Sequence, residues 1–74
     1  MSPIRWTAQR MDQLESAARR GLRVALTRRG TEYIVVALKV TSVDQHDALV
    51  ARLPMTGEDL TFRLDEISTF QVIE

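Results

Sequence analysis

The stretch that decides the fold is Tyr33-Ile34-Val35-Val36-Ala37-Leu38-Lys39-Val40-Thr41-Ser42-Val43. Its β-branched and aromatic side chains favour a strand over a helix, and the run is roughly twice as long as an ordinary strand of about five or six residues. Apolar residues occupy both of its faces. This pattern predicts one strand that bends and pairs with two neighbours in succession, as happens where a small barrel turns its corner.

Shorter strands are expected on both sides of this run. Before it, Leu22, Val24 and Leu26 recur at the twofold period of a half-buried strand, and residues 28–31 read as the turn between the two strands. After it, turn-forming residues and apolar runs alternate. They predict a turn at 44–47, a third strand at 48–53, a loop at 54–59, a fourth strand at 60–64, a single 3₁₀ turn at 65–67 and a fifth strand at 70–73.

The segment before these strands reads as a helix. Thr7 is the expected N-cap, and Trp6 and Met11 stand at the spacing of a hydrophobic staple. Gly21 is the expected stop, because glycine tolerates the left-handed conformation that ends many helices. One narrow apolar stripe predicts a single small buried face, formed by Met11, Leu14, Ala17 and Ala18.

Together these elements predict a mainly β, α+β fold. A helix over about residues 7–20 is followed by a five-stranded, strongly bent antiparallel barrel over about residues 22–74. Short sequential strands with few residues to cover a sheet favour closure into a Sm-like or SH3-like barrel. The length of 74 residues predicts a single domain, 1–74, with one core. A core of this size supplies only about 3–5 kcal/mol of stability, which self-association would reinforce.

Composition favours a reducing compartment. The chain contains no cysteine, so neither a disulfide framework nor a thiolate metal site is available, and we expect a cytoplasmic protein. Residues 1–10 lack the apolar centre of a signal peptide, and no window approaches the roughly 18 apolar residues of a membrane span. We therefore expect no membrane association.

Charge is balanced overall but unevenly distributed. Residues 1–39 carry eight of the ten Lys and Arg and three of the ten acids, a formal charge of +5, and residues 40–74 carry −5. The candidate binding residues in the basic half are called here the arginine group: Arg19, Arg20, Arg23, Arg28 and Arg29, with Arg5 and Arg10 expected nearby at the helix start.

The arginine group has a functional and a structural interpretation. As a binding surface, guanidinium groups meet phosphate oxygens and counterion release drives association. As solvated surface charge, Arg19 and Arg20 complement the helix dipole, and Glu32 pairs with the turn arginines. Single-strand binding usually adds stacking aromatics. Each of the four aromatic residues can instead be explained by packing within the chain: Trp6, Tyr33, Phe62 and Phe70. The alternative for Trp6 is an exposed side chain that anchors a binding partner.

A second candidate cluster is acidic. We call it the acidic group and expect its members to lie together near the barrel's end: Glu58, Asp59, Asp65 and Glu66. As a functional site it would bind a basic protein partner or a divalent ion. As a structural feature it would form turns and aid solubility, with Asp65 capping the 3₁₀ turn. His46, between two turn aspartates, is the lone histidine and a poor metal site by itself. We expect no metal, no cofactor and no enzymatic activity, because nucleophile pairs and a glycine-rich phosphate loop are lacking.

Two strings carry a family resemblance. The junction of the fourth and fifth strands reads Phe62-Arg63-Leu64-Asp65-Glu66-Ile67-Ser68-Thr69-Phe70, and Asp44-Gln45-His46 follows the long second strand. Together with the order of elements, the 62–70 string resembles the Sm-like barrel of the bacterial Rho-inhibitor (Rof) family, which ends in a comparable R-L-D-x-I-[ST]-x-F string. The Asp44-Gln45-His46 turn resembles the motif of Sm proteins known as Sm motif 1. The resemblance implies a barrel that docks on nucleic-acid machinery, without the Asn that RNA-binding Sm proteins place near this Asp.

We therefore expect a small non-catalytic binding or regulatory module. Its partner would be a nucleic acid, RNA in the first instance, or a protein of nucleic-acid machinery, reached through the arginine group. The alternative is a protein-interaction or homo-oligomeric structural module, in which exposed edges of the short strands pair with other copies or partners.

Overall fold

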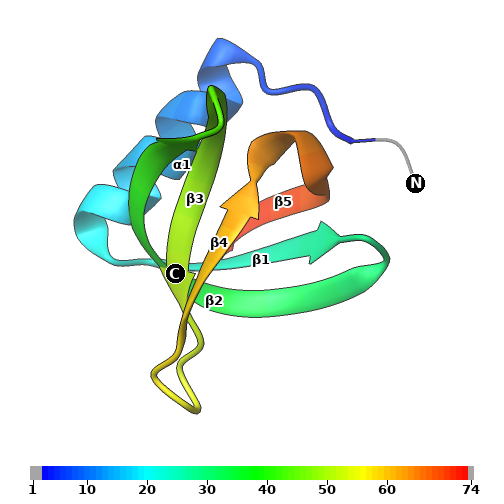
Figure 1. The fold of residues 1–74 in the computed structure, drawn as a ribbon. Helices are drawn as coiled ribbons and strands as arrows, with labels where there is room; N and C mark the ends of the chain where they lie inside the picture. The colour runs from blue at the N-terminus through cyan, green and yellow to red at the C-terminus, as the bar shows by residue number, and fades with distance from the viewer. Residues whose placement is uncertain (1–2, 74) are drawn as a thin grey trace.

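The computed structural model describes residues 3–73. Its elements are α1 (Ala8–Arg20), β1 (Arg23–Arg28), β2 (Thr31–Val43), β3 (His46–Arg52), β4 (Asp59–Arg63), the 3₁₀ turn η1 (Leu64–Glu66) and β5 (Ile67–Ile73). The five strands form one antiparallel sheet in the order β4-β3-β2-β1-β5, and α1 lies along one side of it (Figure 1). The predicted fold class is confirmed: a helix precedes a five-stranded antiparallel sheet in an α+β, small barrel-like fold.

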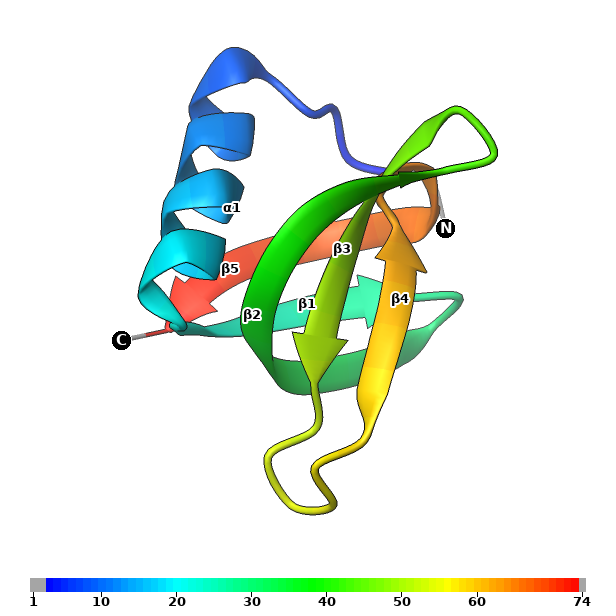
Figure 2. The ribbon, with the colours of Figure 1, turned by 60° about the vertical axis from the view of Figure 1, so that its left-hand side comes forward.

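Strand β2 has two partners. It pairs with β1 from Thr31 to Val36 and with β3 from Val36 to Val43. The register shifts at Leu38, between the paired residues Ala37 and Lys39, which is the irregularity expected of a β-bulge that bends a strand. Figure 2 shows the resulting arc of β2 passing from the β1 side to the β3 side of the sheet. The prediction of one bent strand with two successive neighbours is confirmed.

Both hairpins that flank β2 are tight. The β1–β2 turn is Arg29-Gly30, with φ of 51° and 77°, and the β2–β3 turn is Asp44-Gln45, with φ of 50° and 66°. Positive φ at both central residues is the type I′ pattern, whose twist matches that of the flanking strands. Because the second turn needs only two residues, His46 and Asp47 belong to β3 and not to the turn that the sequence predicted.

The helix begins and ends where the sequence predicted. Oγ1 of Thr7 accepts a hydrogen bond from the backbone N–H of Arg10 at 3.2 Å, and Gly21 takes φ of 65° at the C-terminus. On the buried face, Leu14 and Ala17 have no exposed surface, and Met11 packs against them at the margin of the core. The helix therefore contributes a small apolar wedge to the barrel, as the stripe predicted.

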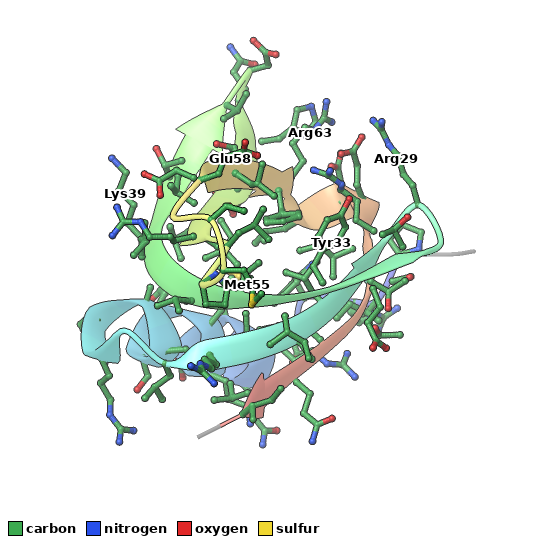
Figure 3. All side chains as sticks on the ribbon, turned by 90° about the horizontal axis from the view of Figure 1, so that it is seen from below. Arg29, Tyr33, Lys39, Met55, Glu58 and Arg63 are labelled. Carbon is green, nitrogen blue, oxygen red and sulfur yellow. The ribbon has the colours of Figure 1, made fainter. Side chains whose placement is uncertain are left out.

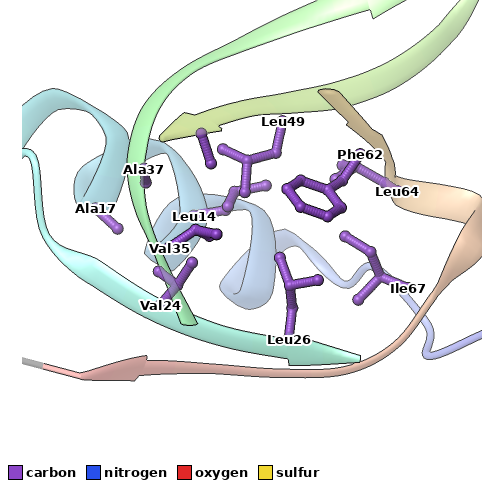
Figure 4. Packing of buried hydrophobic residues seen from close by; sticks show 11 residues of the cluster. Leu14, Ala17, Val24, Leu26, Val35, Ala37, Leu49, Phe62, Leu64 and Ile67 are labelled. Atoms are coloured by element: carbon purple, nitrogen blue, oxygen red, sulfur yellow. The ribbon is translucent and has the colours of Figure 1, made fainter. Parts of the chain in front are cut away.

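The core draws a residue or two from every element. Figure 4 shows these side chains converging from the helix and from all five strands, with the ring of Phe62 among them. The buried cluster consists of Leu14, Ala17, Val24, Leu26, Val35, Ala37, Leu49, Ala51, Phe62, Leu64 and Ile67.

The N-terminal segment is fastened to η1 and β5. The indole N–H of Trp6 donates to the carbonyl oxygen of Leu64 at 2.8 Å, and its ring lies against Phe70 with 5.3 Å between the centroids. The backbone N–H of Ile4 donates to the carbonyl oxygen of Ile67 at 3.0 Å. The structure thus gives Trp6 a partner across the chain, whereas the sequence predicted a local staple with Met11.

Strand β5 is longer than expected. It begins at Ile67, three residues before the predicted start, because Ser68 and Thr69 are tied to Thr27 of β1. The hydroxyl oxygens of Thr69 and Thr27 lie 2.7 Å apart. The 3₁₀ turn begins one residue early, at Leu64, and has no side-chain cap, so the expected capping by Asp65 is wrong.

Truncation of the helix wedge tests this packing. We expect Leu14→Ala to lower the free energy of unfolding by about 2–5 kcal/mol, because Leu14 is fully buried and its truncation leaves a cavity. The matched control is Met55→Ala, since Met55 is 94% exposed and its truncation should change stability by less than about 0.5 kcal/mol. Urea denaturation measures both, and equal effects would show that α1 does not pack as described.

Candidate functional site

The arginine group is divided between the two ends of β1. Arg19 and Arg20 lie in the last turn of α1, and Arg23 begins β1. Arg28 ends the same strand and Arg29 lies in the following turn. At about 3.3 Å per strand residue, the Cα atoms of Arg23 and Arg28 are roughly 16 Å apart. The five arginines therefore do not form one continuous surface.

Arg28 is half-buried and reaches from β1 toward β4. Its guanidinium carbon lies 4.6 Å from the ring centroid of Phe62 and 5.3 Å from that of Tyr33, the geometry of a cation–π contact. Its nitrogens donate to the carbonyl oxygen of Thr61 and to the hydroxyl of Tyr33, each at 3.3 Å. Arg28 thereby links β1 to β4, the far edge of the sheet. The half-buried residue lies at the point where the register between β1 and β5 shifts.

Arg29 is also engaged within the chain. Its guanidinium donates to a carboxylate oxygen of Glu66 at 2.6 Å, joining the β1–β2 turn to η1. The sequence predicted that Glu32 would pair with the turn arginines; the acid that does so at Arg29 is Glu66, 37 positions along the chain. Figure 3 places Arg29 and Lys39 on opposite sides of the molecule.

The other three arginines lie where the α1–β1 connection meets the bend of β2. The backbone N–H of Ala37 donates to the carbonyl oxygen of Leu22 at 2.9 Å, which holds the connection against β2. The groove beside it is lined by Arg19 and Lys39, with Glu15 on the same wall. We call the four exposed basic residues at the end of α1, the start of β1 and the bend of β2 the basic corner, of which Arg20 lines the neighbouring groove between α1 and β5: Arg19, Arg20, Arg23 and Lys39.

Lys39 is the site residue that the sequence analysis missed. It is the one charged residue in the stretch 33–43 and it stands at the β-bulge. A lysine that interrupts a long apolar strand was itself a signal that the strand turns its side chains outward at this point.

The acidic group is divided as well. Glu58 and Asp59 lie at the start of β4, whereas Asp65 and Glu66 follow its end, so the expectation that the four acids lie together is wrong. Each end has basic neighbours. Asp59 accepts from Nε of Arg52 at 2.8 Å, and Asp65 accepts from Nε of Arg63 at 3.1 Å.

His46 lies beside Asp65 and not between two turn aspartates. Its Nδ1 is 3.6 Å from a carboxylate oxygen of Asp65. Within residues 3–73, no three side chains of His, Cys, Asp or Glu gather in the way a metal ion requires. The arrangement is an exposed ion-pair network with Asp65 at its centre, because Arg63 and His46 both contact its carboxylate.

This network shifts two pKa values. The hydrogen bond from Arg63 holds the pKa of Asp65 below its ordinary value, and the charge of Arg63 and that of a protonated His46 act in the same direction. Reciprocally, the hydrogen bond with Asp65 raises the pKa of Arg63. At the other end of β4, the hydrogen bond with Asp59 raises the pKa of Arg52.

Comparisons with known proteins add no relative: no family model, curated protein or solved structure matches the chain. Among the described residues, no helix has the length and apolar character needed to cross a membrane. The fold and surfaces define a small α+β barrel-like domain with a basic corner at one end of β1 and ion pairs around β4.

The link made by Arg28 can be tested without changing charge. We expect Arg28→Lys to lower the free energy of unfolding by about 1 kcal/mol, because an ammonium group cannot reproduce the planar stacking and the two hydrogen bonds. Arg23→Lys, on the exposed face of the same strand, is the matched control and should be nearly neutral. Chemical denaturation of both variants decides the matter, and a neutral Arg28→Lys would refute the proposed link.

The pKa of Asp65 predicts an acid-sensitive contribution to stability. Because its pKa is lowered in the folded state, the unfolded chain takes up this proton first as the pH falls. The contribution is therefore complete above the ordinary value of 3.8 and is lost as the pH falls through the folded-state pKa. Thermal melts from pH 5 downward should show a shallower loss for Asp65→Asn than for the parent, while exposed Asp12→Asn should follow the parent curve.

Proposed function

We propose that this chain is a non-catalytic binding module that contacts the phosphate backbone of nucleic acid through its basic corner. The observation that carries the proposal is that Arg19 and Lys39 line one groove at the bend of β2, while Arg23 begins β1 three residues after α1 ends. Guanidinium and ammonium groups bind phosphate oxygens, and release of counterions would drive the association.

Helix-end stabilisation accounts for only part of this corner. Arg19 and Arg20 lie in the last turn of α1, where the macrodipole favours cations. Arg23 and Lys39 belong to strands, so the dipole gives no reason for their charge. Arg28 and Arg29, with partners at Phe62 and Glu66, are assigned a scaffold role in this proposal.

The mode of recognition we propose is backbone contact without base stacking. Trp6 packs against Phe70, and Tyr33 packs edge-on against Phe62 with 5.1 Å between centroids. Rings held in this way are not available as platforms for splayed bases, which single-strand binding proteins commonly use. We infer a ligand read by its phosphates, with RNA favoured by the resemblance to Sm-like barrels, and a cytoplasmic setting favoured by the lack of cysteine.

A second candidate function is protein interaction or homo-oligomerisation through the sheet edges. The observation that favours it is the strand order, which leaves β4 and β5 at the two ends of the sheet within the described residues. Edge strands present unpaired N–H and C=O groups that template pairing with another chain. A protein of nucleic-acid machinery would be bound in the same way.

Nucleic-acid binding is tested by fluorescence anisotropy with labelled random single-stranded RNA and duplex DNA at two salt concentrations. We expect affinity to fall with salt, and the double variant Arg19→Gln/Arg23→Gln to lower the slope of log affinity against log salt by about 1.5–2, because each arginine that no longer neutralises a phosphate reduces the slope by close to one. RNA should bind at least as tightly as duplex DNA.

The matched control removes the same charge elsewhere. Arg5→Gln/Arg10→Gln changes two cations at the opposite end of α1, where the Arg10 guanidinium donates to the carbonyl oxygen of Arg5 at 2.7 Å. This variant should keep the parent slope. No binding of either probe at low salt, or an equal reduction of slope in both double variants, would remove the basic corner from consideration.

A further inference from the structure

The free edge of β5 lacks the usual protection against pairing. Strand β5 pairs with β1 on one side and ends the sheet on the other. Its sequence, Ile67-Ser68-Thr69-Phe70-Gln71-Val72-Ile73, contains no charged residue, no proline and no glycine. Natural sheets normally blunt an exposed edge with charge, proline or a covering segment, because an uncharged β-prone edge recruits other strands.

The other edge of the sheet is protected. Strand β4 carries Asp59 and Arg63, and each has an oppositely charged neighbour. In addition, the guanidinium of Arg28 donates to the carbonyl oxygen of Thr61 in the middle of β4. The two edges therefore differ in kind: β4 carries charged side chains of its own, whereas β5 carries none, and the charged residues beside it, Asp12 and Arg20, lie in α1 across the groove.

Part of β5 is covered by the chain itself. The N–H of Ile4 donates to the carbonyl oxygen of Ile67, so the N-terminal segment occupies the first position of the strand. From Phe70 to Val72 the strand borders an open groove of about 580 Å³ between itself and α1. Figure 2 shows the end of β5 beside the C-terminal end of α1. Apolar surface in this groove comes from Leu22, Phe70 and Val72, which pack only partly against the core.

We propose that a second copy of this chain pairs with this edge, β5 against β5 in antiparallel orientation, about a twofold axis at Gln71. The inference deepens the second proposed function and rests on it. In this register Phe70 lies opposite Val72 of the other copy, Thr69 opposite Ile73, and Gln71 opposite its own symmetry mate. The two sheets become one continuous sheet across the axis.

The alternation of β5 supports this register. Phe70 and Val72 pair with Leu26 and Val24 of β1, so they lie on the core side. A twofold axis at Gln71 places Phe70 of each copy opposite Val72 of the other copy, and so covers the groove of both copies. Isologous contacts require a self-complementary patch.

The outer face of β5 is equally compatible with this axis. Thr69, Gln71 and Ile73 alternate with Phe70 and Val72, and Thr69 and Gln71 are exposed, so these three residues lie on the outer side. Two glutamine amides that meet at the axis can donate to and accept from each other. With no charge in the strand, no like charges oppose one another.

The experiment measures mass against concentration by light scattering and sedimentation equilibrium on the full chain. We expect a monomer–dimer equilibrium, which Gln71→Lys and Gln71→Glu each weaken by about fivefold or more, since like charges then face each other at the axis. An equimolar mixture of the two variants should restore dimerisation to at least the parent level. Restoration on mixing is specific to a residue that meets its own mate.

Thr61→Lys on exposed β4 is the matched control and should leave the dimer unchanged. Circular dichroism melts confirm that each variant folds, since residues 61 and 71 are both exposed. A larger closed assembly weakened by both Gln71→Lys and Thr61→Lys would overturn the twofold pairing while leaving the second proposed function standing. A monomer at every concentration would overturn the β5 pairing and the homo-oligomeric form of the second proposed function, while pairing of a sheet edge with a different protein would still stand.

Discussion

The fold depends on the requirement that β2 serve two partners at once. If β2 were straight, β1 and β3 would flank it in a flat sheet, and the sheet would enclose no core. The bulge at Leu38 turns the strand, so that Phe62 from β4 reaches Tyr33 near the start of β2. The bend also leaves room for the helix wedge, because Leu14 enters the space that opens where the two halves of β2 diverge.

The same bend explains how charge is distributed. In β1, Val24 and Leu26 are buried and Arg23 is exposed, while the half-buried Arg28 places its guanidinium over Phe62. A half-buried arginine would be costly if it were unpartnered, and the rings of Tyr33 and Phe62 with the carbonyl of Thr61 provide the partners. Arg28 and Arg29 contact Phe62 and Glu66, whereas the basic corner lies at the other end of β1.

Features that depend on residues close together in the sequence were predicted correctly, whereas features that depend on contacts between distant residues were not. The cap at Thr7, the stop at Gly21 and the two-partner strand follow from the properties of neighbouring residues, so sequence alone could predict them. The start of β5 was missed because Ser68 and Thr69 look like turn residues until Thr27 is placed beside them. The same limit applies to the candidate site, since the contacts of Arg28 with Thr61 and of Arg29 with Glu66 join residues more than thirty positions apart.

The sequence by itself determined the order of elements, the bent long strand, the helix boundaries and the presence of surplus positive charge in the first half of the chain. Those properties arise from propensity, periodicity and composition, which act over a few residues. Only the tertiary structure decided that the arginine group is split across β1, that Lys39 joins its exposed part, and that β5 is the unguarded edge. The physical reason is that pairing and burial depend on which strands become neighbours, and that is settled by the packing of the whole core.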